Sequence, residues 1–168
     1  MRISVLGEEA QEAVGRCLAA VMRPPLVIWL KGELGSGKTT LTRGVLRGLG
    51  HDGAVRSPTY TLLEPYDLGP WRVFHLDLYR LGSPEELEYL GLRDLLDEDS
   101  ILMVEWPQKG RGAVPVADVE IHLSYLDEGR SIEFIARDGA GFEMVKGLLQ
   151  SVREQKGVKI LTQAAEGL

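Results

Sequence analysis

A phosphate-binding loop pattern, GxxxxGK followed by Ser or Thr, occupies residues 32–39 of the chain, GELGSGKT. An apolar run, LVIWL at residues 26–30, comes directly before this loop, and a segment with helical spacing comes directly after it. Glycines let such a loop turn its backbone N–H groups toward a phosphate, and the dipole of the following helix favours the anion. The motif in this context predicts a strand, a loop and a helix that hold nucleotide phosphates.

Two side chains of the loop have separate roles in this prediction. Lys38 brings positive charge toward the β- and γ-phosphate oxygens. Thr39 offers its hydroxyl to Mg²⁺ at the start of the helix. The loop alone predicts binding, and hydrolysis also needs an acid near the metal and a group that positions water.

The pattern of apolar residues predicts an α/β chain. Apolar runs at residues 26–30 and 100–106 have the length of strands that are covered on both faces, as in parallel sheets. Alternating segments predict two antiparallel hairpins, and their strands are expected at residues 60–64 with 71–78 and at residues 118–126 with 130–137. We therefore expect a P-loop NTPase-type three-layer fold with a mixed central sheet and antiparallel hairpin additions.

Helices are expected in four places. Three- and four-residue spacing of apolar residues predicts helices at residues 8–22, 38–49 and 142–155. Ser83, Pro84 and Glu86 form a helix start signal, with a capping-box pattern and Pro at the first position, for a helix that runs through Leu96. The last dozen residues are expected to form a flexible tail.

Length and charge restrict the function classes. A chain of 168 residues with 44% hydrophobic content predicts a single P-loop ATPase domain over residues 1–168. The net charge of −6 argues against an autonomous nucleic-acid binder, so contact with RNA is expected to be indirect. Cys17 is the only cysteine and is expected to be a buried apolar residue, which suits a reducing cytoplasm. With no leader pattern and no membrane-length apolar run, a cytoplasmic protein without membrane contact is expected.

Two acids follow apolar strands where a nucleotide site needs a carboxylate. Asp77 ends WRVFHLD and Glu105 ends ILMVE, and ligands of open α/β sheets bind at the carboxyl ends of strands. Glu105 is the preferred Mg²⁺ ligand, because its uniformly apolar run indicates a central strand. Asp77 is expected to hold a metal-bound water or to orient the attacking water. The structural alternatives are an ion pair with Arg80 for Asp77 and an exposed strand-end acid for Glu105.

Three further residues have competing interpretations. His75 is more often an ordinary strand residue than a base. Thr59, in the segment SPTY, is either a switch residue that reaches Mg²⁺ or the γ-phosphate, or part of a plain turn. Trp106 is either a core aromatic or an anchor at an interface.

Five motifs taken together resemble a known family. They are GELGSGKTT, SPTYTLLEPY, HLDLYRL, SPEELEYLGLRDLL and VEWP, and they occur in the order that this family shows, between Glu8 and Arg130. The chain resembles the TsaE (YjeE) family of bacterial ATPases of tRNA threonylcarbamoyladenosine biosynthesis. Ser36, where Ala is frequent in the family, is a mild departure.

The resemblance implies site residues in an ATP- or ADP-binding domain that uses Mg²⁺. Lys38, Asp77 and Glu105 are the expected catalytic residues, Thr39 and Glu105 the expected metal ligands, and Trp106 an additional functional position. The nucleotide-binding positions implied are Glu8, Glu33, Leu34, Gly35, Ser36, Gly37, Lys38, Thr39, Thr40 and Arg130.

The resemblance also implies partners. Members of the family act with TsaD, which transfers the threonylcarbamoyl group, and with its scaffold TsaB, on adenosine 37 of tRNA. The implied activity is slow ATP hydrolysis that these partners stimulate, and the acidic composition agrees with tRNA being held by the partners.

Two other function classes stay open. A nucleotide-controlled binding module would use ATP to set partner affinity, with hydrolysis incidental. A small-molecule kinase would need an acceptor pocket and an Arg-rich lid, for which the sequence has no clear segment. A GTPase is disfavoured, because the guanine-reading NKxD motif needs an asparagine and the chain has none.

Overall fold

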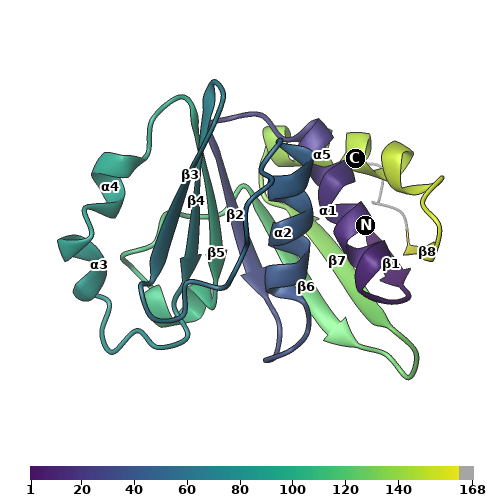
Figure 1. Cartoon of the computed structure of the whole chain (residues 1–168), viewed down its shortest axis with the longest axis horizontal. Coiled ribbons are helices and arrows are strands. Elements are labelled where there is room, and N and C mark those ends of the chain that lie inside the picture. The colour runs from purple at the N-terminus through teal and green to yellow at the C-terminus, as the bar shows by residue number, and fades with distance from the viewer. Residues whose placement is uncertain (163–168) are drawn as a thin grey trace.

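The computed structural model describes residues 1–162, without the side chain of Arg93, and contains one eight-stranded sheet flanked by helices (Figure 1). The strands are β1 Arg2–Val5, β2 Leu26–Lys31, β3 Leu63–Leu68, β4 Trp71–Asp77, β5 Ser100–Glu105, β6 Val119–Tyr125, β7 Arg130–Ala136 and β8 Val158–Thr162. The helices are α1 Glu8–Val21, α2 Lys38–Gly48, α3 Glu86–Tyr89, α4 Leu92–Leu95, the 3₁₀ helix η1 Pro107–Gly110 and α5 Gly139–Val152.

The sheet is mixed, with strand order β3-β4-β5-β2-β6-β7-β1-β8. Strand β2 is parallel to both β5 and β6, and β4 is parallel to β5, whereas the outer pairs are antiparallel. The arrowheads of β2, β4, β5 and β6 therefore meet at one edge of the sheet, the lower edge in Figure 1. The expected P-loop α/β fold with a mixed sheet and two hairpins is confirmed.

The two faces of the sheet are covered by different elements. Helices α1 and α2 lie side by side against one face, and α5 contacts α1 and β7 (Figure 1). Around β4 and β5 the other face packs against α3, α4 and η1, which form a second apolar cluster. Since side chains alternate along a strand, Val73 and Ile101 belong to the α1–α2 side, whereas Phe74 and Leu102 belong to the other. By the same alternation His75, Asp77 and Glu105 lie on the side that carries the phosphate loop.

Several predicted elements occur where the sequence placed them. Helices α1 and α2, strands β2 and β5, and the β6–β7 hairpin agree with their predicted ranges to within two residues. Gly50, which follows α2, has a left-handed φ of 95°, and this ends the helix. Cys17 is buried, as expected, and burial raises the pKa of its thiol.

The helix predicted from Ser83 to Leu96 is wrong, because two short helices, α3 and α4, replace it. The start signal itself works: the Glu86 carboxylate accepts hydrogen bonds from the backbone N–H groups of Gly82 and Ser83, both at 2.9 Å. Gly91 then adopts a φ of 63°, which is left-handed and breaks the helix after one turn.

Other boundaries also moved. The first hairpin strand, predicted at 60–64, is β3 at Leu63–Leu68, since Leu62 has a φ of 64° and the turn shortens to Gly69 and Pro70. Helix α5 begins three residues earlier than predicted, where the Asp138 side chain caps the N–H of Gly141 at 2.7 Å.

The two ends of the described chain form strands that the sequence did not predict. Strand β1 lies between β7 and β8. The expected flexible tail covers residues 157–168; of these, β8 pairs with β1, and residues 163–168 lie outside the described part. Each strand is short and contributes few apolar residues, so only its partner strands make it recognisable. Among the described helices, none is long and apolar enough to cross a membrane.

Helices α1 and α2 approach each other through glycines. A Cβ on Gly15 would lie 2.5 Å from the carbonyl oxygen of Leu41 and 2.7 Å from the Cα of Gly44. Both obstacles are backbone atoms, so a larger residue can be accommodated only if the helices separate. This close approach brings α1 against the helix that begins at the phosphate loop.

We predict that Gly15→Ala destabilises the fold by about 1–3 kcal/mol, because overpacking at a backbone contact forces the helices apart. Gly139→Ala is the matched control, since a Cβ there meets nothing within 4 Å. Urea unfolding of both variants measures the difference, and equal midpoints would contradict the packing argument.

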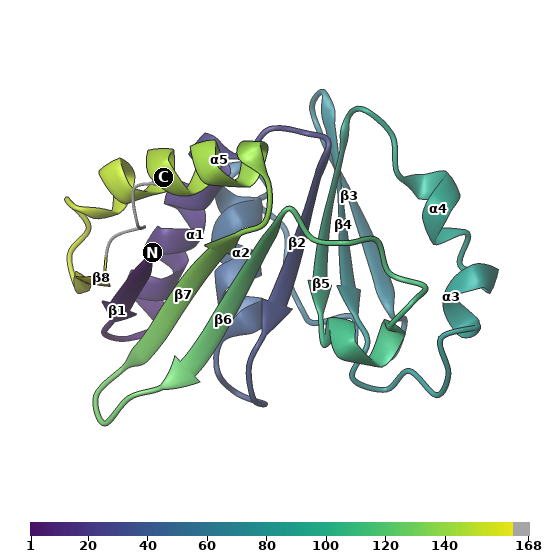
Figure 2. The same cartoon turned by 180° about the vertical axis from the view of Figure 1, so that it is seen from behind.

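A buried carboxylate stabilises the face of the sheet that is turned toward the viewer in Figure 2, where α1 and α2 lie behind β6 and β7. Glu120 accepts from Lys31 Nζ at 2.7 Å, from Arg137 Nη2 at 2.8 Å and contacts His122 Nε2 at 2.9 Å. Burial alone would raise the pKa of Glu120, but the hydrogen bonds from Lys31, His122 and Arg137 lower it to about 2. Glu120 thus joins β2, β6 and the segment that follows β7.

Because the folded pKa of Glu120 is depressed, its stabilisation is fully present above its ordinary pKa of 4.5 and is lost as the pH falls toward about 2. We predict that Glu120→Gln lowers the free energy of unfolding by about 1–3 kcal/mol at pH 7. The difference from wild type should shrink as the pH falls from 4.5 toward about 2, because Glu120 of the folded wild type then also loses its charge. Thermal melts of both proteins from pH 7 to pH 2.5 measure this, and a pH-independent difference would contradict it.

Candidate nucleotide-binding site

A cleft opens at the carboxyl ends of β4 and β5, over the phosphate loop. It is formed by the loop and the start of α2, by the segment between α2 and β3, and by the residues that follow β4 and β5. The lining residues are Leu34, Gly35, Gly37, Lys38, Thr39, Thr40, Ser57, Thr59, Asp77, Tyr79, Arg80, Glu105 and Trp106.

The phosphate loop is held in a strongly curved form. Gly35 and Gly37 have φ values of 76° and 98°, which only glycine adopts without strain. The Lys38 ammonium donates to the carbonyl oxygens of Gly32 and Glu33 at 2.8 and 2.9 Å, so it spans the loop from the inside. Burial lowers the pKa of Lys38, and the negative charges of Glu105 and Asp77 oppose this shift.

Gln11 of α1 also holds the loop, and sequence reasoning missed it. Its side-chain amide donates to the Gly37 carbonyl at 2.8 Å and to the Ser36 carbonyl at 3.4 Å. A Cβ on Gly37 would overlap this amide, which shows how closely α1 supports the loop. The available signal was a polar residue on the apolar stripe of the first helix, three residues before the buried Val14.

Glu105 meets the loop across the sheet. It is 3% exposed, and its Oε1 accepts the Thr39 hydroxyl at 3.0 Å and lies 2.9 Å from Nε2 of His75. The sequence expectation that Glu105 ends a central strand is confirmed, because β5 lies between β2 and β4. The alternative of an exposed strand-end acid is wrong.

Asp77 lies beside Glu105, since β4 and β5 pair in the register Asp77 with Glu105. Its Oδ2 accepts the Ser57 hydroxyl and, at 3.0 Å, the Thr59 hydroxyl, while Oδ1 accepts the backbone N–H of Tyr79 at 3.0 Å. The alternative of an ion pair with Arg80 is not what forms, because the Arg80 guanidinium lies over the Tyr60 ring, 4.6 Å from its centroid.

Trp106 continues β5 into the cleft. Its φ of 58° is left-handed, and this turns the indole back over the loop, where Lys38 Nζ lies 4.6 Å from the ring centroid. The Tyr79 ring packs beside it at a centroid distance of 5.2 Å. Trp106 is therefore a half-buried wall of the cleft, and it also packs against the edge of the second apolar cluster.

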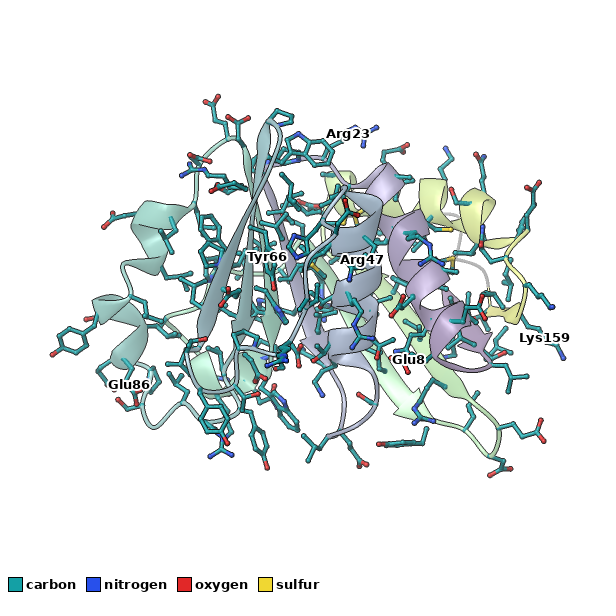
Figure 3. The ribbon with its side chains drawn as sticks, in the orientation of Figure 1. Glu8, Arg23, Arg47, Tyr66, Glu86 and Lys159 are labelled. Atoms are coloured by element: carbon teal, nitrogen blue, oxygen red, sulfur yellow. The ribbon has the colours of Figure 1, made fainter. Side chains whose placement is uncertain are left out.

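Four predicted nucleotide-binding residues are not among those that line the cleft. Glu33 and Ser36 belong to the phosphate loop itself, whereas Glu8 and Arg130 lie on other elements. Glu8 begins α1 beside α2 and pairs with Arg43 at 2.7 Å (Figure 3). Arg130 begins β7, and its guanidinium lies 4.2 Å from the Tyr125 ring centroid. Tyr125 donates its hydroxyl to the Leu34 carbonyl at 2.7 Å, so Arg130 reaches the loop through Tyr125.

The residues present fit a nucleotide with Mg²⁺. Thr39, Glu105 and Asp77 supply hydroxyl and carboxylate oxygens, the ligand type that Mg²⁺ prefers, and the metal usually takes only one or two protein groups plus phosphates. Gly35, Gly37 and the start of α2 supply backbone N–H groups for the phosphates.

Comparison with known proteins agrees with this geometry. The family model of the threonylcarbamoyl adenosine biosynthesis protein TsaE matches residues 6–132. The tRNA threonylcarbamoyladenosine biosynthesis protein TsaE of Haemophilus influenzae is 49% identical over 120 residues, which are 71% of this chain and 76% of that protein. The protein of the same name from Bacillus subtilis is 35% identical over 138 residues, or 82% of this chain and 85% of that protein.

A solved structure has the same fold. The crystal structure of Bacillus subtilis YdiB superposes with a TM-score of 0.76 at 27% identity, and the match covers 89% of this chain and 94% of that one. The match of the family model covers the loop, both acids and Trp106. On these grounds the chain belongs to the TsaE family of threonylcarbamoyl adenosine biosynthesis proteins.

Proposed function

We propose that this protein binds ATP with Mg²⁺ and hydrolyses it in support of threonylcarbamoyladenosine formation at adenosine 37 of tRNA. One observation carries the proposal: the Thr39 hydroxyl of the phosphate loop lies 3.0 Å from the Glu105 carboxylate at the end of the neighbouring strand. A loop hydroxyl beside a strand-end acid is the pair that holds Mg²⁺ in P-loop NTPases. The names of the relatives supply the pathway.

The chain's own groups account for phosphate binding. The N-terminus of α2 and the curved loop present N–H groups to the β-phosphate. Lys38, which donates to two loop carbonyls, is placed to turn its ammonium toward the β- and γ-oxygens. Mg²⁺, when bound by Thr39 and Glu105, neutralises charge that develops on the phosphate oxygens.

Asp77 is assigned to water. Its carboxylate is buried next to Glu105 and is oriented by the Ser57 and Thr59 hydroxyls and by the N–H of Tyr79. A carboxylate fixed in this way can accept a hydrogen bond from an attacking or metal-bound water and hold it in line with the γ-phosphate. Intrinsic turnover is expected to be slow and stimulated by partners.

A nucleotide-controlled switch is the second candidate. The segment between α2 and β3 is tied to the acids of the site through Ser57 and Thr59, whose hydroxyls both bind Asp77. A change at the γ-phosphate would therefore reach this surface segment directly. In that case ATP binding, and not its cleavage, would control the partners.

The partners that we propose are TsaD and TsaB, with tRNA held by them. The net charge of −6 argues against an extended surface on this chain that binds the tRNA backbone directly. The site has its own aromatic and basic rim, in which Arg80 lies over Tyr60 and Lys109 over Tyr79. A protein partner that reaches this rim would sit next to the γ-phosphate position and could influence hydrolysis there.

We predict that Glu105→Gln lowers ATP hydrolysis in the presence of both partners and tRNA by about 10²-fold, because the metal loses its carboxylate. ATP binding should persist, since the loop and Lys38 are intact. Release of inorganic phosphate measures turnover, and calorimetry measures binding. Glu98→Gln, which changes an exposed acid in the chain segment before β5, is the matched control.

Two outcomes would overturn parts of the proposal. Unchanged phosphate release by Glu105→Gln would remove the catalytic assignment. Full tRNA modification by a variant that binds ATP without cleaving it would favour the switch over the ATPase.

We predict that Gln11→Leu weakens ATP binding by about tenfold, equivalent to about 1.4 kcal/mol, because two loop carbonyls lose their donor and the loop relaxes. Gln155→Leu, in the segment between α5 and β8 and outside the cleft lining, is the control. Titration calorimetry with ATP and Mg²⁺ measures both, and equal affinities would show that α1 does not support the loop energetically.

A further inference from the structure

A third buried polar side chain lies behind the two acids of the cleft. His75 is fully buried on β4, two residues before Asp77, and its Nε2 lies 2.9 Å from Oε1 of Glu105. It does not line the cleft, so it has no direct path to a nucleotide. The only hydrogen-bond partner of its side chain among residues 1–162 is Glu105.

The hydrogen bond fixes the tautomer of the ring. A carboxylate oxygen accepts and does not donate, so the hydrogen belongs to Nε2 of His75. The other nitrogen, Nδ1, is buried and has no hydrogen-bond partner in the described part of the chain. Burying an unpaired ring nitrogen is unfavourable, and an apolar residue would fill this core position at lower cost. The polarity of His75 therefore points to a role at Glu105 beyond packing.

The Glu105 carboxylate receives two donors on the same oxygen. Oε1 accepts from the Thr39 hydroxyl at 3.0 Å and from His75 Nε2 at 2.9 Å. The Thr39 bond connects the carboxylate to the loop, and it leaves the lone pairs of the Thr39 oxygen free for a metal ion. The His75 bond comes from a rigid central strand, since β4 pairs with β5 along its length. The His75 bond therefore does not involve the phosphate loop.

We propose that His75 is a positioning residue that holds Oε1 of Glu105, so that the carboxylate presents itself to Mg²⁺ without reorienting. This inference rests on the proposed function. Groups that orient a metal ligand from behind raise metal affinity by restricting the ligand to its binding geometry. His75 itself touches neither nucleotide nor metal.

Two substitutions separate positioning from packing. His75→Leu keeps an apolar volume and removes the donor, whereas His75→Gln keeps an N–H that can reach Oε1. Met103→Leu is the control for core packing. Met103 is fully buried on β5 and pairs with His75 of β4. Each variant is titrated with a non-hydrolysable ATP analogue by calorimetry, first in EDTA and then over a range of Mg²⁺ concentrations.

His75→Leu should raise the Mg²⁺ concentration at half-saturation by about tenfold or more, with metal-free affinity for the analogue within about twofold of wild type. His75→Gln should recover most of the loss, and Met103→Leu should match wild type. An unchanged Mg²⁺ dependence in His75→Leu would overturn the proposal, as would equal impairment of His75→Leu and His75→Gln.

A second measurement uses only the wild type and a variant at position 105. It therefore does not depend on whether a His75 variant folds. The ¹⁵N spectrum of the unliganded wild type should show a protonated Nε2 and an unprotonated Nδ1 for His75, and Glu105→Gln should shift the Nε2 signal. The opposite tautomer would overturn the proposal. If wild type binds the analogue no better with Mg²⁺ than in EDTA, the proposed function fails. If wild type gains affinity with Mg²⁺ and His75→Leu gains it equally, the inference about His75 alone fails.

Discussion

The site depends on the parallel alignment of β2, β5 and β4. Parallel strands end at the same edge of a sheet, so the loop that leaves β2 and the acids that end β4 and β5 converge without any long-range loop. The hydrogen bond between Thr39 and Glu105 forms because this alignment brings the two side chains to the same edge of the sheet. A shift of β5 by one residue would turn Glu105 to the opposite face and break the site, because side chains alternate along a strand.

The same alternation gives β4 one face that packs into an apolar cluster and one face that carries polar side chains toward the cleft. On β4, Phe74 and Leu76 belong to one apolar cluster with residues of α3 and α4, whereas His75 and Asp77 face the phosphate loop. The apolar side anchors β4 and β5 so that the polar side can hold His75, Asp77 and Glu105 in fixed positions. Buried polar groups are costly, and a well-packed opposite face supplies the stability that tolerates them.

The sequence predicts those features of the site that depend on residue type and on short-range spacing. The phosphate loop, the apolar runs and the strand-end acids follow from residue type and spacing, and Glu105 lies where they indicated. Contacts between distant elements could not be read in this way: Gln11 reaches the loop from α1, and β1 is a strand only because β7 and β8 flank it. The break at Gly91 was missed because a single glycine is compatible with a helix until its φ is known.

For the proposed function, the charges of the cleft favour binding of nucleotide and metal together. Asp77 and Glu105 are two buried carboxylates within the site. Lys38 is the one cationic side chain that the phosphate loop contributes to it. A triphosphate alone would meet both acids at close range in a region of reduced dielectric, where repulsion is strong. A divalent cation between them converts this repulsion into attraction. The same carboxylates that disfavour a bare nucleotide would thus make the site selective for the magnesium complex.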